Sequence, residues 1–331
     1  MSDELQHWVA RQLGRHPQQL QWQPLSGDAG FRRYYRCRCG NDSWMAVLAP
    51  PASENNTAFV QIAGLLADAG VNVPAVLAVD YQHGFMLQND LGDRLLLPQL
   101  TAATADDYYH KAMQQLQLMQ GITADRLQSL PRYDEPALRL ELSYFSDWFV
   151  SRLLDIDVRA HEQQLLVSLF DWLVDSALQQ PQVFVHRDYH SRNIMLTASG
   201  ELATIDFQDA VLGPASYDLV SLLRDCYVVW PAADVSRWVE QFRASTWPQL
   251  DAEQFRRGFD LIGLQRHIKV LGVFARLSIR DNKHGYLNDL PTVIRYVRDV
   301  AAMYPQAAEF LDWFDQRLMP QARRQSWGKA L

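Results

Sequence analysis

Oxygen-bearing side chains in the middle of the sequence have the types and spacing that metal-dependent phosphoryl transfer requires. His186, Arg187, Asp188 and Asn193 match the pattern H-R-D-x-x-x-x-N, and Asp206 follows downstream. In kinase loops with this pattern the aspartate accepts the proton of the attacking hydroxyl, while the asparagine and a later aspartate bind Mg²⁺. Each residue alone would more simply cap a turn. Their joint spacing predicts Asp188 as the catalytic base and Asn193 and Asp206 as metal ligands.

Short apolar segments surround these residues and predict strands that hold them in place. Residues 183–185 are β-branched or aromatic and stop at His186. Residues 194–196 and 202–205 predict a hairpin, and Asp206 stands at its exit. Because strand ends are rigid, we expect the base and both metal ligands to be delivered into one cleft.

The composition is that of a globular protein and excludes several other classes. The 331 residues are 48% apolar and 21% charged, which is enough for one large domain or two lobes. The net charge of −7 disfavours a general nucleic-acid or membrane-surface binder. No basic segment followed by an apolar core opens the chain, and no window approaches about 18 uninterrupted apolar residues. We therefore expect a cytoplasmic protein with no nucleic-acid or membrane partner.

The cysteines favour a reduced protein without a zinc site. Cys37, Cys39 and Cys226 are odd in number, and no further ligands stand at zinc-binding spacing. We expect buried or half-buried free thiols.

The periodicity changes from strand-like to helical near residue 90, which predicts an α+β fold with two lobes. Residues 1–90 form the expected β-rich, nucleotide-binding N-terminal lobe, with helices at 4–13 and 57–69 and strands at 20–25, 31–39, 44–48, 74–80 and 84–88. Residues 91–331 form the expected mostly helical C-terminal lobe, which carries catalysis and substrate binding. Its only expected strands are those around residues 183–206. Its helices are expected at 104–120, 138–154, 160–179, 215–229, 233–245, 251–281, 291–304 and 307–316.

A glycine-containing turn, S-G-D-A-G at 26–30, joins two expected strands and is followed by arginines. Glycines between antiparallel strands let backbone N–H groups approach phosphate oxygens, although an ordinary hairpin turn explains a single such loop more simply. Arg32 and Arg33 stand beside the turn and are the better phosphate ligands. Period-two alternation places Arg36 and Arg38 on the face of Arg32, where we expect them to be solvated.

Beyond these motifs, the sequence resembles the aminoglycoside phosphotransferase and choline kinase superfamily of small-molecule kinases. The resemblance lies in H-R-D-Y-H-S-R-N (186–193), I-D-F-Q-D (205–209) and G-P-A-S-Y-D-L (213–219). The longer run from 205 to 227 is similar to a narrower group, the bacterial anomeric sugar kinases, which phosphorylate N-acetylmuramate and N-acetylglucosamine on the C1 hydroxyl in cell-wall recycling. G-D-A-G-F-R-R-Y-Y-R (27–36), A-P-P (49–51) and F-M-L-Q-N-D-L-G-D-R (85–94) resemble the same group, so the likeness spans nearly the whole chain.

The resemblance implies a bilobal, protein-kinase-like fold that uses ATP and Mg²⁺ to phosphorylate a small amino sugar. It implies that Asp188 is the base, that Asn193 and Asp206 bind Mg²⁺, and that Asp218 braces the catalytic loop. A helix N-terminal acid is an equal alternative for Asp218. The implied nucleotide-binding residues are Ser26, Gly27, Asp28, Ala29, Gly30, Phe31, Arg32 and Arg33, with adenine against the backbone near Gln88, Asp90 and Leu91.

Two features depart from the kinase pattern. The predicted metal ligand Asp206 begins the sequence D-F-Q at 206–208, where kinases have D-F-G. No lysine precedes Lys111. Kinases normally place a lysine on the third strand, where residues 44–48 are all apolar here. A Walker A loop is also excluded, because no G-K-[ST] occurs. We hypothesise that Arg32 or Arg33 contacts the phosphates instead.

The sugar site is predicted more loosely. A lactyl carboxylate and an N-acetyl group call for a cation and amide-type partners. Arg224 and Asp225 interrupt an apolar helix, and we interpret them as facing the cleft, with a buried structural pair as the alternative. The other expected substrate residues are His190, Arg192, Gln208 and Asp209, although the first two would equally brace the catalytic loop. Structural or solvated roles are expected for Arg266, His267, Arg276 and Arg280.

Two other functions stay open at this point. The same fold could phosphorylate an aminoglycoside, choline or methylthioribose, but cationic acceptors want an acidic, aromatic pocket, whereas the arginines near the cleft favour an acidic sugar. The chain could instead be a non-catalytic pseudokinase module. The missing N-terminal lysine supports that alternative, and the intact Asp188, Asn193 and Asp206 oppose it.

Overall fold

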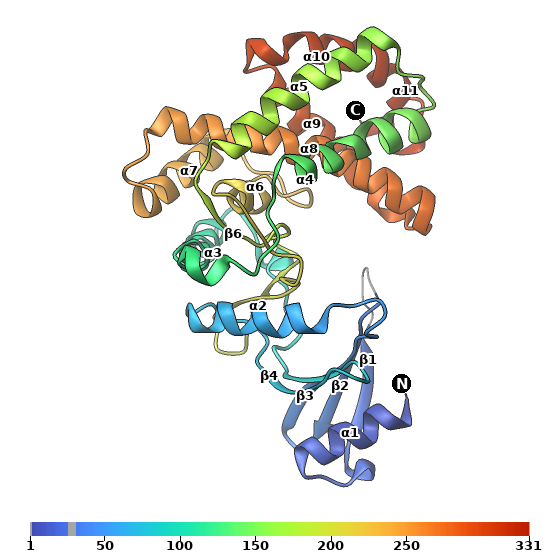
Figure 1. Cartoon of the computed structure of the whole chain (residues 1–331), viewed down its shortest axis with the longest axis vertical. Coiled ribbons are helices and arrows are strands. Elements are labelled where there is room, and N and C mark those ends of the chain that lie inside the picture. The colour runs from blue at the N-terminus through green and yellow to red at the C-terminus, as the bar shows by residue number, and fades with distance from the viewer. Residues whose placement is uncertain (1, 26–30, 331) are drawn as a thin grey trace. The chain divides into compact units, whose positions relative to one another are not determined.

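The computed structural model describes residues 2–25 and 31–330, which pack as two compact units (Figure 1). Unit 1 comprises Met1–Thr104 and Arg192–Ala210, and unit 2 comprises Ala105–Ser191 and Val211–Leu331. Unit 1 holds the larger sheet and unit 2 most of the helices, which confirms the expected α+β class. The units are defined by packing, so the expected lobe boundary after residue 90 stays a prediction.

Unit 1 is built on a five-stranded antiparallel sheet with strand order β1-β2-β3-β5-β4. Each strand lies within two residues of its expected bounds, because alternating apolar residues and turn glycines define them. The strands are β1 (Gln21–Leu25), β2 (Arg33–Cys39), β3 (Asp42–Leu48), β4 (Val76–Asp80) and β5 (Phe85–Asn89). In this register Arg36 of β2 lies opposite Met45 of β3, and Met45 lies opposite Gln88 of β5.

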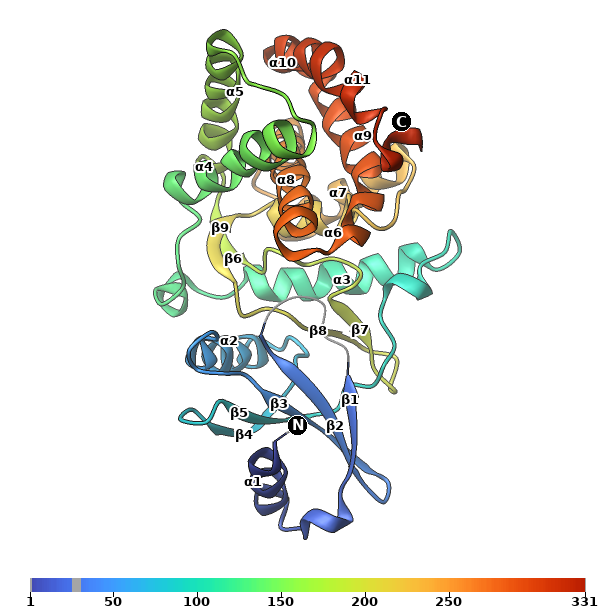
Figure 2. The same ribbon diagram turned by 90° about the vertical axis from the view of Figure 1, so that its right-hand side faces the viewer.

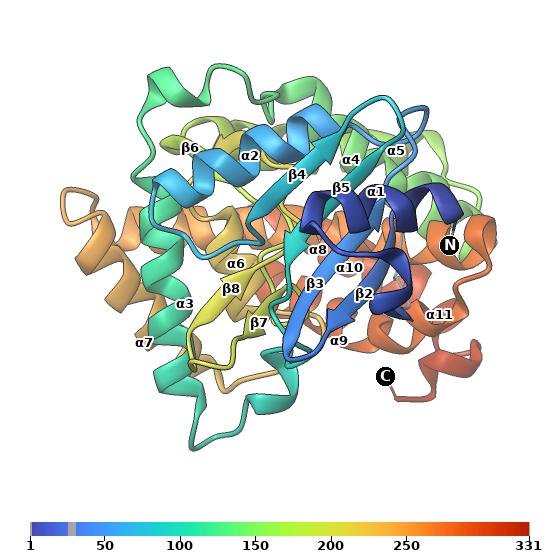
Figure 3. The same cartoon turned by 90° about the horizontal axis from the view of Figure 1, so that it is seen from below.

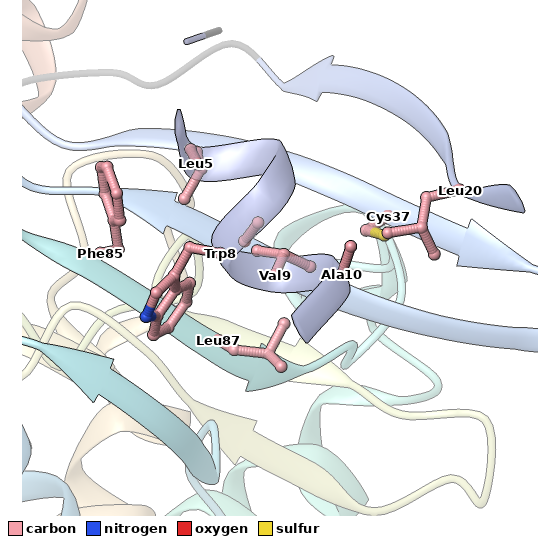
Figure 4. Packing of buried hydrophobic residues seen from close by; sticks show 9 residues of the cluster. Leu5, Trp8, Val9, Ala10, Leu20, Cys37, Phe85 and Leu87 are labelled. Atoms are coloured by element: carbon pink, nitrogen blue, oxygen red, sulfur yellow. The ribbon is translucent and has the colours of Figure 1, made fainter. Parts of the chain in front are cut away.

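Helix α1 (Asp3–Leu13) covers one face of the sheet (Figures 3 and 4). The Ser2 hydroxyl accepts the N–H of Leu5 at 3.3 Å, and Gly14 ends the helix in the left-handed region, at φ 62°. The apolar stripe of α1 is buried against residues of β2, β3 and β5. This core contains Leu5, Trp8, Val9, Ala10, Leu20, Cys37, Ala46, Phe85 and Leu87.

Helix α2 (Asn56–Asp68) lies on the opposite side of the sheet from α1 (Figures 1 and 2). The side chain of Asn55 caps α2 by accepting the N–H of Ala58 at 3.0 Å. The phenyl ring of Phe59 in α2 contacts that of Phe207, with ring centroids 4.8 Å apart. Each face of the sheet in unit 1 therefore has a helix beside it.

The predicted catalytic hairpin forms the second sheet of unit 1. Strands β7 (Ile194–Leu196) and β8 (Leu202–Thr204) pair in antiparallel fashion, as expected. Residues 94–96 are bonded to the outer side of β7. The N–H of Leu96 donates to the carbonyl of Ile194 at 2.8 Å, and the N–H of Leu196 donates to the carbonyl of Arg94 at 2.7 Å.

Unit 2 is helical apart from one two-stranded sheet. Helix α8 contacts α4, α5, α6, α7 and α9 and runs through the middle of the unit (Figure 2). A Cβ atom on Gly272 of α8 would overlap the carbonyl group of Tyr144, so the backbones of α8 and α4 touch there. The helices are α3 (Ala105–Gln120), α4 (Glu135–Tyr144), α5 (Ala160–Leu178), α6 (Tyr217–Leu223), α7 (Ala232–Thr246), α8 (Ala252–Asp281), α9 (Leu290–Ala301), α10 (Ala308–Trp313) and α11 (Met319–Ala322).

The structure differs from the sequence prediction for unit 2 at three places. The helix expected at 215–229 ends at Leu223, because the charged Arg224 and Asp225 leave the helix and bind elsewhere in the unit. The helix expected at 138–154 begins at Glu135 and continues after Tyr144 as a π-helical turn, Phe145–Leu153. An additional strand, β9 (Val211–Pro214), pairs with β6 (Gln182–Val185) and was missed because it is short.

Arg36 is the clearest error in unit 1. We expected it on a solvated face, but its side chain is only 2% exposed and pairs with Asp90 and Asp93. Arg38, two residues further along the same face, is exposed as expected. The alternation of residues in β2 did not reveal that Asp90 and Asp93 cover Arg36.

Two expectations concern the chain as a whole. Among the residues that the structure describes, no helix is both long and apolar enough to span a membrane. The cysteines are free thiols, as expected, with Cys37 and Cys226 buried and Cys39 half-buried.

Candidate active site

The predicted base lies in unit 2, on the loop that follows β6. Arg187, next to Asp188, has φ 76°, in the left-handed region that side chains other than glycine rarely adopt. Asp218 at the start of α6 holds this bend: its carboxylate accepts the N–H of His186 at 2.6 Å and the N–H of Arg187 at 3.0 Å. This confirms Asp218 as the brace of the loop. Burial raises the pKa of Asp218 to about 7, although the two N–H donors favour its charged form.

Asp225 holds the other end of the loop. Its carboxylate accepts the backbone N–H of Ser191 at 3.0 Å and also the Ser191 hydroxyl, and Asp225 is only 1% exposed. The neighbouring Arg224 donates to Asp260 at 2.6 Å and stacks on the ring of Phe259. The described partners of both residues are thus structural, and their contact with a substrate stays a prediction.

Asp188 is partly buried and surrounded by positive charge. Burial alone would raise the pKa of the Asp188 carboxyl, but nearby cations outweigh it and hold the pKa below its ordinary value. A carboxylate with a low pKa is ionised at neutral pH, as a base that accepts a hydroxyl proton must be. In order of decreasing effect, the groups that lower it are Lys269, His190, Arg266 and Arg187.

A buried ion cluster stands behind this loop. Glu141 of α4 is 6% exposed and accepts from Arg187, from Tyr133 and, at 2.9 Å, from the Lys269 ammonium. Lys269 of α8 also donates to the hydroxyl of Tyr217 at 3.1 Å. Burial would raise the pKa of Glu141, but Lys269 and Arg187 lower it overall, so the cluster stays charged. We did not predict Glu141, Tyr133 or Lys269, which are far from the loop in sequence.

Two further residues considered in the sequence analysis lie in or near the loop. His190 packs edge-on against Tyr227, with ring centroids 5.4 Å apart. Arg266 is 4% exposed and donates to the Ser221 hydroxyl at 2.8 Å, which agrees with the structural role expected for it. Substrate contact by His190 stays a prediction.

Unit 1 brings the predicted metal ligands together. The side-chain amide of Asn193 donates to Asp206 at 3.4 Å, and the N–H of Ile205 donates to the backbone carbonyl of Asn193 at 3.0 Å. Asp206 is exposed and has φ 66°, so its backbone is also left-handed. Gln208 donates to the second carboxylate oxygen at 2.8 Å. Of the predicted substrate residues in this unit, Gln208 is therefore next to Asp206, the predicted metal ligand. Contacts of Gln208, Arg192 and Asp209 with a substrate stay predictions.

The donor set suits Mg²⁺. Mg²⁺ keeps several waters, takes one or two protein oxygens and completes its shell with phosphate oxygens. An exposed carboxylate beside an amide oxygen offers that combination. Within residues 2–25 and 31–330 no three His, Cys, Asp or Glu side chains cluster in a way that would hold a metal on their own. Asn193 and Asp206 thus fit Mg²⁺ better than a structural zinc ion.

The predicted phosphate-binding turn is described only in part. Ser26, Gly27, Asp28, Ala29 and Gly30 lie outside the described residues. Phe31 is 62% exposed, and its N–H donates to Glu54 at 3.0 Å.

The two arginines beside the turn differ in burial. Arg32 is 7% exposed, lies 3.4 Å from the Glu54 carboxylate and stacks on Phe59. Arg33 is exposed. Arg33 is thus the more accessible of the two to a phosphate.

The predicted adenine segment follows the central strands. Gln88 lies within β5 and is buried, while Asp90 and Leu91 come after the strand. Asp90 is bound by Arg36 and by the hydroxyl of Ser43 at 2.5 Å. Burial would raise the pKa of Asp90, but these donors lower it overall. Its carboxylate is therefore a structural acceptor in this state.

Comparison with known proteins identifies relatives over most of the chain. The model of the phosphotransferase enzyme family (APH) matches residues 21–259. The chain is 42% identical over 291 residues to the N-acetylmuramate/N-acetylglucosamine kinase of Pseudomonas aeruginosa, covering 86% of this chain and 85% of that protein. It is 37% identical over 296 residues to the protein of the same name from Neisseria meningitidis, covering 86% of each.

Solved structures confirm the fold. The ethanolamine kinase of Plasmodium vivax matches with a TM-score of 0.65 at 12% identity, covering 85% of this chain and 83% of that one. A choline kinase of Streptococcus pneumoniae matches with a TM-score of 0.62 at 14% identity, covering 91% and 98%. Likeness at this identity establishes the fold alone, and it confirms the kinase-like fold expected from the sequence.

Proposed function

The chain belongs to the phosphotransferase enzyme family, and from this premise we propose that it is an ATP-dependent kinase of amino sugars. Its proposed acceptor is the C1 hydroxyl of N-acetylmuramate, N-acetylglucosamine or both. The observation that carries this proposal is the identity of 37–42% to kinases named for these two sugars, over 86% of the chain. Such a product belongs to peptidoglycan recycling, and the proposed compartment is the cytoplasm.

Asp188 is the proposed base, which accepts the proton of the sugar hydroxyl as the γ-phosphoryl group is transferred. The bend at Arg187, held by Asp218, and the anchor of Ser191 on Asp225 support this role, because they fix both ends of the loop. Asn193 and Asp206 would hold Mg²⁺, which when bound neutralises charge on the phosphate oxygens. Positioning and electrostatics would then supply most of the rate.

The remaining site residues are proposed by class. Phosphate contact is assigned to the turn at 26–30 with Phe31, Arg32 and Arg33, and adenine to the backbone around Gln88, Asp90 and Leu91. Sugar contact is assigned to His190, Arg192, Gln208, Asp209, Arg224 and Asp225. The described bonds of Arg224 and Asp225 also support a positioning role for this pair.

Turnover of a substrate panel tests the function. With ATP and Mg²⁺, we expect transfer to N-acetylmuramate or N-acetylglucosamine, with NMR of the product placing the phosphate on C1. Choline, methylthioribose and an aminoglycoside serve as the competing acceptors. Transfer to one of these instead would replace the proposed substrate, and Mg²⁺-dependent ATP binding without any transfer would indicate a pseudokinase.

Asp188→Asn tests the mechanism. The amide is close in shape but cannot accept the proton, so we expect a normally folded protein whose kcat falls about 10²–10⁴-fold. The exposed Asp157→Asn is the matched control and should leave kcat unchanged. A folded Asp188→Asn variant with nearly wild-type kcat would remove Asp188 from the role of base.

A separate prediction is that arginines contact the ATP phosphates in place of the missing lysine. Losing both cations beside the turn should weaken phosphate binding, so Arg32→Ala with Arg33→Ala should raise KM for ATP about tenfold or more. Because Arg32 also packs on Phe59, the exposed Arg33→Ala alone is a second variant that spares this packing. An unchanged KM for ATP in both variants would contradict the assignment.

A further inference from the structure

One buried arginine of unit 1 gathers a whole segment of backbone around itself. The Arg36 guanidinium donates to both carboxylate oxygens of Asp90, at 2.6 and 3.0 Å, to the carboxylate of Asp93 at 2.9 Å and to the carbonyl of Gly92 at 3.1 Å. Paired, charge-assisted bonds of this kind define an orientation as well as an attraction. Arg36 thereby fixes residues 90–93, the segment that follows β5.

Asp90 has no free acceptor pointing elsewhere in this arrangement. Besides Arg36, one of its oxygens accepts the Ser43 hydroxyl at 2.5 Å and the other accepts the N–H of Gly92 at 3.0 Å. Gly92 has φ 90°, which a residue with a side chain would adopt only under strain. The carboxylate therefore shapes a tight turn and does not offer itself to a ligand.

The turn is followed by residues 94–96, which are bonded to the hairpin that carries the proposed metal ligands. The Arg94 carbonyl accepts the N–H of Leu196, its guanidinium donates to the carbonyl of Thr197 at 2.6 Å, and the Leu96 N–H donates to Ile194. Residues 94–96 are in this way bonded along the outer side of β7, with an isolated bridge between Leu95 and Met195. Asn193 immediately precedes β7, and Asp206 follows β8.

These contacts form one continuous path within unit 1. It starts at β2, whose first residue is the proposed phosphate ligand Arg33, passes through Arg36 to residues 90–93, and ends at β7. The proposed adenine-contacting backbone lies on the same path, at the end of β5. A disturbance at Arg36 would reach the nucleotide residues and the metal residues together.

We propose that Arg36 is a positioning residue that sets residues 90–96, and through them the adenine-contacting backbone and the metal-binding hairpin, in one register. The inference rests on the proposed function, in that unit 1 binds ATP and Mg²⁺. Arg36 touches neither ligand in this proposal. Loss of its bidentate contact should therefore weaken binding of the nucleotide and the metal jointly and change binding of the acceptor sugar less, because the proposed sugar contacts His190, Arg224 and Asp225 belong to unit 2.

Arg36→Lys tests the proposal, because lysine keeps the positive charge but cannot bind Asp90 in bidentate fashion and Asp93 at once. We expect KM for ATP and the Mg²⁺ concentration for half-activation each to rise about tenfold, with KM for the sugar within about twofold of wild type. The matched control is Arg38→Lys, the exposed neighbour on the same face, which should change none of the three. Far-UV circular dichroism and urea unfolding establish that each variant is folded.

Two further measurements keep the test decisive. The Kd of MgADP, determined by calorimetry without sugar, should rise about tenfold in Arg36→Lys even if no tested sugar is phosphorylated, which separates this inference from the proposed function. If Arg36→Lys does not fold, Asp93→Asn removes the negative charge of one partner of Arg36, at a side chain that is 70% exposed, and should raise the same Kd about threefold. A folded variant with unchanged nucleotide and Mg²⁺ constants, or one whose sugar KM rises equally, would overturn the proposal.

Discussion

The charge of the Asp188 carboxylate depends on side chains from other elements of unit 2. Lys269 has the largest effect among the cations that lower the pKa of Asp188, and it is held in place by Glu141. The ionisable groups around Asp188 include Arg187 and His190 of the loop, Asp218 of α6, Arg266 and Lys269 of α8, and Glu141 of α4. Lys269 is thus both part of a buried ion cluster and a determinant of the charge of Asp188, the proposed base.

Lys269→Met should alter the pH profile of the enzyme. The positive charge of Lys269 favours ionised Asp188, so its loss raises the pKa of Asp188 and moves the acidic limb of kcat/KM to higher pH. We also expect kcat at neutral pH to fall about tenfold to a hundredfold, because the loop loses part of its support. Rates measured across pH check both effects, with exposed Lys111→Met as the control.

A merely structural role for Lys269 would lower stability without moving that limb, and this outcome would contradict the assignment. Combining the variant with Glu141→Gln gives a double-mutant cycle. Either single change removes one partner of a buried charge, at a cost of up to about 3–5 kcal/mol. The double variant should be more stable than the sum of the single changes predicts.

At the residue scale, the sequence predicted what its local spacing encodes. Asn193 and Asp206 prove to be neighbours, and Asp218 braces the loop. Glu141 and Lys269 were missed because their contact with the loop depends on how α4 and α8 pack. The available signal was Arg187 itself, since a cation two residues after a buried strand requires a partner. The error at Arg36 has the same cause, because its carboxylate partners lie more than fifty positions away along the chain.

Among the elements, α8 organises unit 2 through its backbone as well as its side chains. At Gly272 the helix touches the end of α4, at the point where α4 gives way to a π-helical turn. A side chain there has no space, because the atoms that it would meet are backbone atoms. Gly272 is therefore required by packing and not by a turn.

Gly272→Ala should destabilise the protein. Alanine is favoured over glycine within a helix by about 1 kcal/mol, but the overlap with Tyr144 forces α4 and α8 apart, at a cost of about 1–3 kcal/mol or more. We expect a lower midpoint of urea unfolding. The control is Gly64→Ala in α2, where a Cβ atom would meet nothing within 4 Å, and it should be neutral or stabilising. Equal midpoints for the two variants would show that the α8–α4 contact is not tight.

The sequence predicted long elements better than short ones. The bounds of α5 and α8 agree with expectation within one residue, because many apolar positions define their period. β9 is four residues long, and it is a strand only because β6 lies beside it. Helix α6 is shorter than expected because Arg224 and Asp225 form stronger bonds outside the helix, with Asp260 and Ser191. Local periodicity cannot report such distant partners.

At the scale of the molecule, the single motif that opened the sequence is divided between the two units. Asp188 packs within unit 2 and Asn193 within unit 1, although only four residues separate them. The α+β class followed from the change in periodicity. The sequence did not predict that residues 192–210 belong to unit 1, because this depends on the pairing of residues 94–96 with β7.

The sequence of unit 1 contains no lysine, and this has a practical consequence for finding such proteins. Acyl-phosphate derivatives of ATP are used to profile kinases, because they transfer a tag to a lysine amine beside the bound nucleotide. The lysines of this chain are Lys111, Lys269, Lys283 and Lys329, and all belong to unit 2. If unit 1 binds the nucleotide and arginines hold the phosphates, the reagent finds no lysine to tag in that unit. A proteome-wide survey that counts tagged lysine peptides would then recover none from unit 1.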